Sequence, residues 1–254
     1  MTSLKNHTIV VTGGTRGIGL GIAKRFMADD AQVVIGARST PGNIPSVGDN
    51  TAHFLEVDVR DPESSQSLID FAVEKTGRLD VLINNAGGSP EVPAVDASPR
   101  FTDAIIRLNL IAPAVLSQQA YQAIMATTGS GSIINIASVS SIRPSPGTAA
   151  YGAAKAGLLN LGRSLAQEWA PKVRVNTIIA GLTKTESAHE HYGGEDGIEK
   201  IEQRMPMQRM AVPDDIAKAC YYLSSAEAEY ISGATLEVHG GGEPPSFLSL
   251  QRDN

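Results

Sequence analysis

Short apolar runs alternate along the chain with longer stretches in which apolar residues recur every three or four positions. The runs are rich in β-branched residues, as in Thr8-Ile9-Val10-Val11-Thr12, which is typical of buried strands. The longer stretches predict helices over 17–27, from 61 onward, and over 101–126, 151–169 and 213–224, with Pro113 bending the third. Seven apolar runs predict strands at 8–12, 32–37, 53–57, 79–84, 132–136, 174–179 and 234–238.

This alternation predicts an α/β protein. Strands that are apolar on both faces belong to parallel sheets covered by helices on two sides, and the connections in such sheets are right-handed. We therefore expect a doubly wound Rossmann fold with a seven-stranded parallel sheet and helices on both faces. Residues 1–242 contain no repeat or linker and are expected to form one domain. The segments with no regular pattern are 88–99, 140–149 and 183–208, and the last is expected to be a mobile surface loop that contributes to substrate binding.

Composition narrows the possible partners. The 254 residues include 21 basic and 27 acidic ones, a net charge of −6, which argues against a nucleic-acid partner because such binding needs a basic surface. The single cysteine, Cys220, cannot form an internal disulfide, and no apolar run is long enough to cross a membrane. We therefore expect a cytoplasmic protein. In the C-terminal tail, 243–254, we expect Phe247, Leu248 and Leu250 to be buried, for example against another subunit.

The first predicted strand runs directly into a glycine-rich turn, Thr12-Gly13-Gly14-Thr15-Arg16-Gly17-Ile18-Gly19. Glycine permits positive φ angles and, because it lacks a Cβ, lets a phosphate approach the main chain. The free N–H groups of the helix that follows favour an anion at the same place. A tight turn without a ligand would also use glycine, but the strand–turn–helix context favours a dinucleotide pyrophosphate.

Together with two further motifs, this turn resembles that of the short-chain dehydrogenase/reductase family, in the branch whose chains have this length. Asn84-Asn85-Ala86-Gly87 matches the motif that closes the fourth strand, and Asp58-Val59 matches the pair after the third. The resemblance extends from Thr8 to about Gly242. It implies that the carboxyl group of Asp58 meets the adenine amine. The cofactor contacts that it implies in these motifs are Gly13, Thr15, Arg16, Gly17, Ile18, Gly19, Asp58, Val59, Asn85, Ala86 and Gly87.

Two arginines bear on the choice of dinucleotide. The second strand ends Gly36-Ala37-Arg38-Ser39, with alanine where NAD-type members of the family have aspartate, and Arg16 lies inside the glycine turn. Arginine binds the 2′-phosphate that distinguishes NADP(H), whereas an acid at the strand end would repel it. We predict NADP(H). If both arginines are only solvated surface charges, NAD(H) remains the alternative.

Tyr151-Gly152-Ala153-Ala154-Lys155 places a phenol and an ammonium group on one helix face, thirteen residues after Ser138. The free phenol has a pKa near 10 and is a weak base, and a nearby positive charge stabilises its ionised form. The family resemblance makes Tyr151 the acid/base, Ser138 the residue that orients the substrate oxygen, and Lys155 the residue that lowers the phenol pKa. Tyr151 and Lys155 then also contact the cofactor, Lys155 through the nicotinamide ribose.

Two more positions follow from the resemblance. Arg107-Leu108-Asn109-Leu110 matches the segment with the family's fourth catalytic residue, so Asn109 is expected to hold a water that links Lys155 to solvent. The alternative is a polar residue filling a helix kink. Ala180-Gly181-Leu182-Thr183-Lys184-Thr185 carries alanine where the family has proline, which predicts a less rigid loop. Gly181, Thr183 and Thr185 are still expected to bind the nicotinamide carboxamide.

The sequence thus predicts an NADP(H)-dependent oxidoreductase that interconverts a ketone and a secondary alcohol, with 3-oxoacyl thioesters, steroids, small ketones and sugars all open as substrates. The pocket walls are expected at 88–95, 139–147 and 185–207, where Arg143 could meet a substrate carboxylate or phosphate, or simply face water. No metal is expected, since His189-Glu190-His191 fits a solvated loop.

Three alternatives remain. The first is an NAD-dependent alcohol dehydrogenase of the same family. The second is a nucleotide-sugar epimerase of the same superfamily, for whose C-terminal substrate region this chain has no room. The third is a dinucleotide-sensing protein without catalysis, although such proteins commonly lack part of the Ser-Tyr-Lys set. The resemblance also implies a homo-oligomer, a tetramer or dimer, joined through the helices that contain Asn109 and Tyr151.

Overall fold

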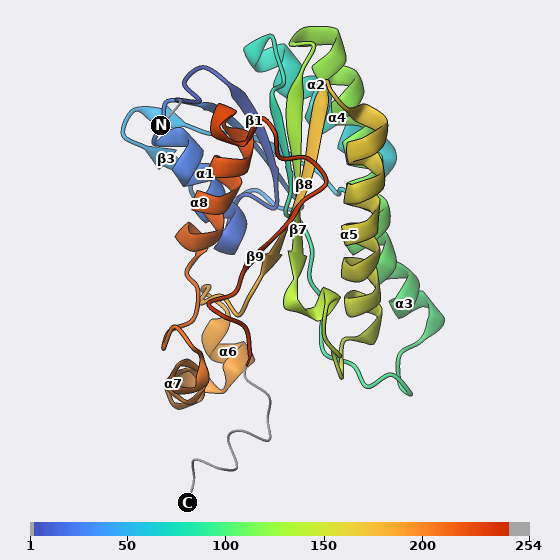
Figure 1. The fold of residues 1–254 in the computed structure, drawn as a ribbon, viewed down its shortest axis with the longest axis vertical. Coiled ribbons are helices and arrows are strands. Elements are labelled where there is room, and N and C mark those ends of the chain that lie inside the picture. The colour runs from blue at the N-terminus through green and yellow to red at the C-terminus, as the bar shows by residue number, and fades with distance from the viewer. Residues whose placement is uncertain (1–2, 244–254) are drawn as a thin grey trace, which may run out of the picture.

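A single parallel sheet forms the centre of the protein. The computed structural model describes residues 3–243, and its seven main strands lie in the order β5-β2-β1-β6-β7-β8-β9, every neighbouring pair parallel (Figure 1). The predicted fold class is confirmed. The strands are β1 (Thr8–Thr12), β2 (Gln32–Ala37), β5 (His53–Glu56), β6 (Val81–Asn84), β7 (Gly131–Ser138), β8 (Val173–Ala180) and β9 (Thr235–Val238).

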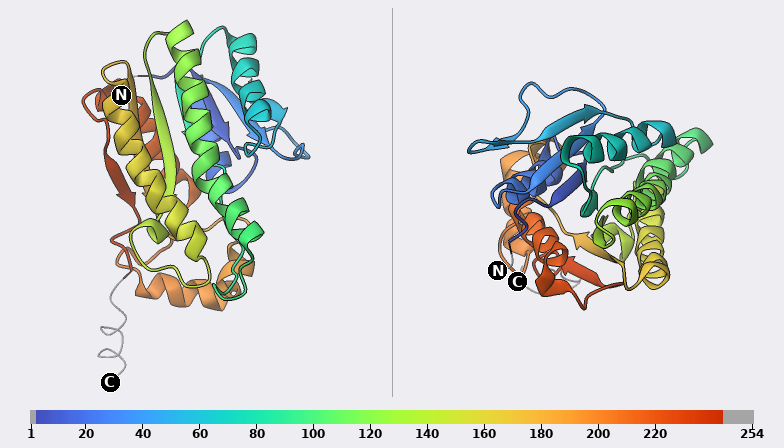
Figure 2. Two further views of the ribbon diagram at one scale, coloured as in Figure 1. Left: turned by 90° about the vertical axis from the view of Figure 1, so that its right-hand side faces the viewer. Right: turned by 90° about the horizontal axis from the view of Figure 1, so that it is seen from above.

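Helices cover both faces of this sheet. One face carries α1 and α8, and the other carries α2, α4 and α5 (Figures 1 and 2). Within β1, Ile9 and Val11 point to the first face and Val10 to the second, which explains why the strand is β-branched throughout. The helices are α1 (Gly17–Met27), α2 (Pro62–Thr76), α3 (Pro99–Ile106), α4 (Ala112–Thr127), α5 (Ala149–Trp169), α6 (Ala188–Tyr192), α7 (Gly194–Arg204) and α8 (Pro213–Ser224).

The predicted helix over 101–126 is interrupted rather than merely bent. A π-helical turn, Arg107–Ile111, separates α3 from α4, and the N–H of Ala112 bonds the carbonyl of Arg107 five residues earlier. Pro113 has no N–H to donate to the carbonyl of Asn109, four residues before it, so a regular α-helix cannot continue through this point. The wider turn brings Asn109 into the interior, where it is fully buried.

The prediction of a loop without regular structure over 183–208 was wrong. This segment folds into α6 and α7, which lie beyond the carboxyl ends of the strands (Figure 1). They enclose a small core of their own, Ala188, Ile198, Met205 and Met210. A two-residue hairpin, β3 (Ser46–Val47) with β4 (Asn50–Thr51), is a further feature that the sequence pattern did not predict. Phe247, Leu248 and Leu250, predicted to be buried, lie outside the described residues.

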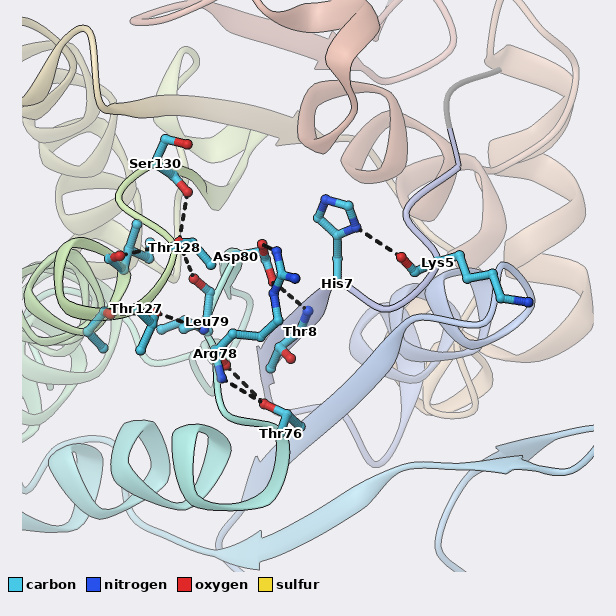
Figure 3. Close-up of polar contacts among 12 residues, drawn as sticks. Lys5, His7, Thr8, Thr76, Arg78, Leu79, Asp80, Thr127, Thr128 and Ser130 are labelled. Carbon is cyan, nitrogen blue, oxygen red and sulfur yellow. Dashed lines mark hydrogen bonds and ion pairs between the residues drawn. The ribbon is translucent and has the colours of Figure 1, made fainter.

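The amino edge of the sheet is fixed by a compact set of polar contacts (Figure 3). The carboxylate of Asp80 accepts a 2.8 Å hydrogen bond from the Thr8 N–H and two more from the Arg78 guanidinium. The hydroxyl of Thr128 donates to the Leu79 carbonyl at 3.0 Å. Because these bonds join the starts of β1 and β6, they hold the register that brings the two glycine-containing motifs together at the opposite edge.

Candidate functional site

The carboxyl edge of the sheet gathers the motifs that the sequence singled out. The glycine turn follows β1, the Asn-Asn-Ala-Gly motif ends β6, Ser138 ends β7 and Gly181 follows β8. Because β1, β6, β7 and β8 are parallel neighbours, all four motifs lie together at the carboxyl ends of the strands. This is the edge at which α/β proteins bind their ligands.

Glycine is required in the turn between β1 and α1. Gly13 has a φ of +68°, which disfavours any residue with a side chain. A Cβ on Gly19 would lie 2.2 Å from the Gly13 carbonyl oxygen, which no packing adjustment of a side chain can relieve. The turn therefore brings the start of α1 directly against the end of β1 and leaves main-chain N–H groups at the helix start.

The Asn-Asn-Ala-Gly motif braces this turn. The Thr12 hydroxyl accepts hydrogen bonds from the N–H groups of Asn85 and Ala86 at 3.0 and 2.9 Å. The Asn85 side-chain amide donates in return to the carbonyls of Thr12 and Gly13. These reciprocal bonds tie two motifs 73 residues apart in the chain, so Asn85 and Ala86 support the turn as well as lying beside it.

A carboxylate of the chain itself bonds the start of α1. The N–H of Gly17 donates to the two carboxylate oxygens of Glu186, at 3.0 and 3.3 Å, and a Cβ on Gly17 would lie 3.4 Å from the Thr185 methyl group. An anion on a main-chain donor at a helix N-terminus is the arrangement that a dinucleotide phosphate uses. The turn therefore fits a pyrophosphate, and Glu186 occupies a donor that such a group could take.

The side expected to hold the adenosine is positively charged. Arg16 and Arg38 are exposed, and in the part of the chain that the structure describes neither makes an ion pair. The Arg60 guanidinium bonds both oxygens of Asp58, with Nε 2.9 Å from Oδ1, and holds the pKa of that carboxyl below its usual value. Sequence reasoning missed Arg60, although its place two residues after Asp58 was a signal for this pairing. An adenine amine would share Asp58 with it.

Ser138 and Tyr151 lie within hydrogen-bonding distance of each other at the ends of β7 and the start of α5. Burial raises the pKa of Tyr151 above its ordinary value, and the hydrogen bond with Ser138 partly opposes this rise. The Ser138 hydroxyl also accepts from the N–H of Ser140 at 3.2 Å, which fixes its oxygen. The phenol is therefore held in its protonated form at neutral pH, in contact with the serine.

Lys155 is buried, one turn after Tyr151 on the same helix. Its Nζ donates to the Ile136 carbonyl at 2.7 Å and lies 5.7 Å from the centre of the Tyr151 ring. Burial lowers the pKa of Lys155 to about 8, and among residues 3–243 no carboxylate pairs with it. The expected fall in the Tyr151 pKa is absent from this arrangement: burial of the phenol raises the pKa, and the opposing effect comes from the hydrogen bond with Ser138.

Asn109 connects the π-helical turn to the glycine motif after β6. Its side-chain oxygen accepts from the Gly88 N–H at 2.9 Å, and its amide donates to the carbonyls of Gly88 and Ile105. A Cβ on Gly87 would lie 2.7 Å from the Asn109 oxygen and 3.1 Å from Lys155 Nζ. Asn109 and Lys155 therefore both lie against Gly87.

The segment expected to hold the nicotinamide is attached by main-chain bonds on both sides. Gly181 donates to the Val238 carbonyl at 3.0 Å, and Lys184 donates to the Ala211 carbonyl at 2.7 Å. Ala180 lies in the parallel ladder opposite Val238, so the alanine that replaces the family proline extends the strand. Thr183 is buried, and the Thr185 hydroxyl lies 3.3 Å from that of Ser187.

These groups together can stabilise a dinucleotide and move a proton at one substrate oxygen. Three further residues near them carry charge or hydroxyls that sequence reasoning did not assign: Glu186, Tyr192 and Glu243. Among residues 3–243 no cluster of three metal-ligating side chains is present, and none of the described helices is long and apolar enough to span a membrane. Burial raises the pKa of the Cys220 thiol, as expected for a core cysteine.

Comparisons with known proteins agree with this geometry. A family model described as enoyl-(acyl carrier protein) reductase matches residues 13–243. The human dehydrogenase/reductase SDR family member 4 is 32% identical over 95% of this chain and 88% of its own. The ligand-free aldohexose dehydrogenase of Thermoplasma acidophilum superimposes with a TM-score of 0.88 and 29% identity, over 97% and 99% of the two chains. An actinorhodin polyketide ketoreductase with NADPH gives 0.84 and 27%, over 95% and 98%.

Proposed function

The chain belongs to the short-chain dehydrogenase/reductase family of oxidoreductases, and on that premise we propose that it transfers a hydride between NADP(H) and a ketone or secondary alcohol. The observation that carries the proposal is the placement of Ser138, Tyr151 and Lys155 beside the glycine turn, at one edge of the sheet. A protein that only senses a dinucleotide would need the glycine turn to bind it but would not need Ser138, Tyr151 and Lys155. The proposal therefore favours an enzyme over a dinucleotide sensor.

When bound, the nicotinamide supplies the hydride in reduction and accepts it in oxidation. In reduction, Tyr151 donates its proton to the carbonyl oxygen of the substrate, and the Ser138 hydroxyl donates a hydrogen bond to the same oxygen. Lys155, still largely protonated at neutral pH with a pKa of about 8, stabilises the phenolate that forms. Asn109, which lies with Lys155 against Gly87, positions a water through which Tyr151 regains its proton.

The residues that would hold the dinucleotide are those at the edge just described. Main-chain N–H groups of the turn bind the pyrophosphate, Lys155 and Tyr151 bind the nicotinamide ribose, and Gly181, Thr183 and Thr185 bind the carboxamide. Asp58 and Val59 border the adenine. The Glu186 carboxylate on the Gly17 N–H supports the first of these assignments, because it shows that the turn accepts an anion.

NADP(H) is preferred over NAD(H) because Arg16 and Arg38 lie exposed on the side proposed for the adenosine. The end of β2 carries Ala37 there and no acidic residue. The charge of Arg38 also lowers the pKa of Asp58, which supports a position close to it. The related ketoreductase was crystallised with NADPH, which favours the same cofactor here. NAD(H) remains the second candidate, because Asp58 is an acid in the same region.

Titration of the purified protein with NADPH and with NADH tests this preference. We expect the wild type to bind NADPH at least tenfold more tightly, and Arg38→Gln to lose most of that ratio, because a 2′-phosphate loses one charge-assisted bond. Lys24→Gln, on the far end of α1, is the matched control and should leave the ratio unchanged. A wild type that prefers NADH would contradict the NADP(H) assignment without affecting the family.

The protein is further proposed to form a homo-oligomer through the outer faces of α4 and α5. Ile111, just before α4, is 43% exposed, and the exposed small residues Ala149, Ala153 and Ala156 of α5 line a groove shared with the loop 140–146. Such faces allow helices of two subunits to approach closely. Light scattering during size-exclusion chromatography should give the mass of a dimer or tetramer, and a monomer at micromolar concentration would contradict the assembly.

A further inference from the structure

An ion pair joins two distant segments that both follow strands of the sheet at its carboxyl edge. Arg143 lies five residues after Ser138, and Glu243 lies five residues beyond β9. The Arg143 Nη2 is 2.6 Å from Glu243 Oε1, and its Nη1 donates to the Pro144 carbonyl. Arg143 is 36% exposed and Glu243 39%, so the pair stands at the border between the protein and solvent.

The charges of this pair act on a phenol of the 183–208 segment. Burial raises the pKa of Tyr192, at the end of α6; the Glu243 charge raises it further and the Arg143 charge lowers it. Tyr192 in turn adds to the rise in the pKa of Tyr151. The charges of the pair therefore act on Tyr192, and Tyr192 acts on Tyr151.

The loop that carries Arg143 is fixed against the catalytic helix and a second wall of the cleft. A Cβ on Gly152, the residue after Tyr151, would lie 3.0 Å from the Ser140 carbonyl, so this loop packs directly on the first turn of α5. The N–H of Val92 donates to the Gly147 carbonyl at 2.8 Å and joins the loop to the 88–95 wall. The guanidinium thus has a defined position at the cleft.

The segment that carries Glu243 is equally well placed. Gly240 and Gly241 have φ angles of +64° and +92°, and a Cβ on them would meet the side chains of Met207 and Pro206, which follow α7. Glycine is needed for this path because other residues rarely adopt such angles. The two turns lead the chain from β9 across the substrate wall to Arg143.

Resting on the oxidoreductase function, we propose that Glu243 is a specificity-determining residue that neutralises Arg143 and makes the cleft select uncharged carbonyl substrates. A guanidinium at this position would on its own recognise a substrate carboxylate or phosphate. The Glu243 carboxylate occupies the Arg143 guanidinium in place of a substrate anion, and its own charge repels an anionic substrate. The substrate class of this site is therefore a neutral ketone or alcohol rather than a free keto acid.

The competition favours the internal carboxylate. Glu243 is tethered to the protein, so its effective concentration at Arg143 is on the order of millimolar or higher, and a free anionic substrate has to displace it. Discrimination of this kind depends on a repulsive group as much as on an attractive one. Replacing Glu243 by glutamine removes the repulsion and leaves the Arg143 charge uncompensated, which should reverse the preference.

The test uses a neutral and an anionic ketone of the same skeleton, methyl phenylglyoxylate and phenylglyoxylate. Their dissociation constants from the protein saturated with NADPH are measured by the fluorescence of the bound nucleotide, and kcat/KM is measured for each. For the wild type we expect the ester to bind at least tenfold more tightly than the acid. In Glu243→Gln the ratio of the dissociation constant of the acid to that of the ester should fall at least tenfold. In the double variant Glu243→Gln with Arg143→Gln, this ratio should rise again toward the wild-type value.

Glu195→Gln is the control, because Glu195 is an exposed carboxylate on α7 that, like Glu243, pairs with basic side chains, here Lys184 and His189. It should leave the ratio unchanged. The proposal is overturned if Glu243→Gln changes the ratio less than threefold, if Glu195→Gln changes it equally, or if the acid fails to bind Glu243→Gln at all. Each of these results leaves the proposed function standing, whereas failure of the wild type to bind NADPH in the same cuvette contradicts that function.

Discussion

The two sides of the carboxyl edge are built from different parts of the chain. On the side proposed to bind the cofactor, the groups on offer are main-chain N–H groups of one continuous turn, held by Thr12 and Asn85. On the side proposed to bind the substrate, Arg143 and Glu243 are side chains from two distant segments that pair only in the folded protein, and their charges act on Tyr192 of a third. The cofactor side therefore depends on backbone shape, and the substrate side depends on charge.

This difference suits two different tasks. A dinucleotide presents the same phosphates in every reaction, and a rigid backbone cradle recognises them without further adjustment. Substrates differ from one enzyme to the next, and side chains on the segments around a fixed scaffold can change without disturbing the fold. Glu186 connects the two sides, because it belongs to the substrate wall and bonds the cofactor turn.

Lys155 is the residue on which both sides depend, so its replacement should have the largest effect. Lys155→Met should lower kcat at least 1,000-fold, since phenolate stabilisation and cofactor positioning are lost together. The same variant should melt at a higher temperature than the wild type at pH 7, because it removes a buried charge. Catalytic assays and thermal unfolding of one preparation measure the two effects, and a lower melting temperature would contradict the burial argument.

The pH dependence of stability sharpens that test. The pKa of Lys155 is about 8 in the folded protein and near 10.5 when unfolded, so the unfolded chain holds more protons between these values. The destabilisation by the buried charge is complete below pH 8 and disappears as the pH rises toward 10.5. Between pH 8 and 10 the melting temperature of the wild type should therefore approach that of Lys155→Met. A constant difference would show that burial of the charge is not its cause.

The backbone character of the cofactor side is tested by a glycine. Gly19→Ala places a methyl group against the Gly13 carbonyl, so NADPH binding should weaken at least 100-fold. Gly42→Ala is the matched control, because a Cβ there meets nothing within 4 Å, and its NADPH affinity should equal that of the wild type. Fluorescence titration measures both. A Gly19→Ala protein that binds NADPH normally would contradict the close approach.

Removing the contact between Glu186 and Gly17, which joins the two sides, should have the smallest effect on NADPH affinity. Glu186→Gln removes a negative charge that competes with the cofactor phosphate for the Gly17 N–H, and NADPH should bind three- to tenfold more tightly. Glu190→Gln, an exposed acid on α6, controls for net charge and should change the affinity less than twofold. Unchanged or weaker binding by Glu186→Gln would show that the two carboxylate contacts do not oppose the cofactor.

Local patterns predicted most of the cofactor side. The β-branched runs gave the strands of the sheet nearly residue by residue, and the glycine turn gave the start of α1. Ser138, Tyr151 and Lys155 could be predicted as a set because their spacing along the chain is fixed by one strand and one helix. The structure places the first two in contact and the third one helical turn away, as that spacing requires.

The substrate side was harder to predict for physical reasons. Ile198, Ile201 and Met205 have helical spacing, but Gly193, Gly194 and Gly197 concealed it. Gly197 is needed because a Cβ there would lie 1.8 Å from the Tyr192 carbonyl, where α7 packs on α6. The contacts of Glu186 with Gly17, and of Glu243 with Arg143, join residues 169 and 100 positions apart, and no local pattern carries such pairings.

The most direct test of the account is a single-turnover experiment on the protein saturated with NADPH. A panel of neutral ketones is mixed with wild type and with Tyr151→Phe, and the loss of nicotinamide absorbance is followed. We expect the wild type to oxidise its bound NADPH with at least one ketone, and Tyr151→Phe to bind NADPH equally well but to react at least 100-fold more slowly. Equal rates in the two proteins would contradict the assignment of Tyr151 as the proton donor and, with it, the proposed mechanism.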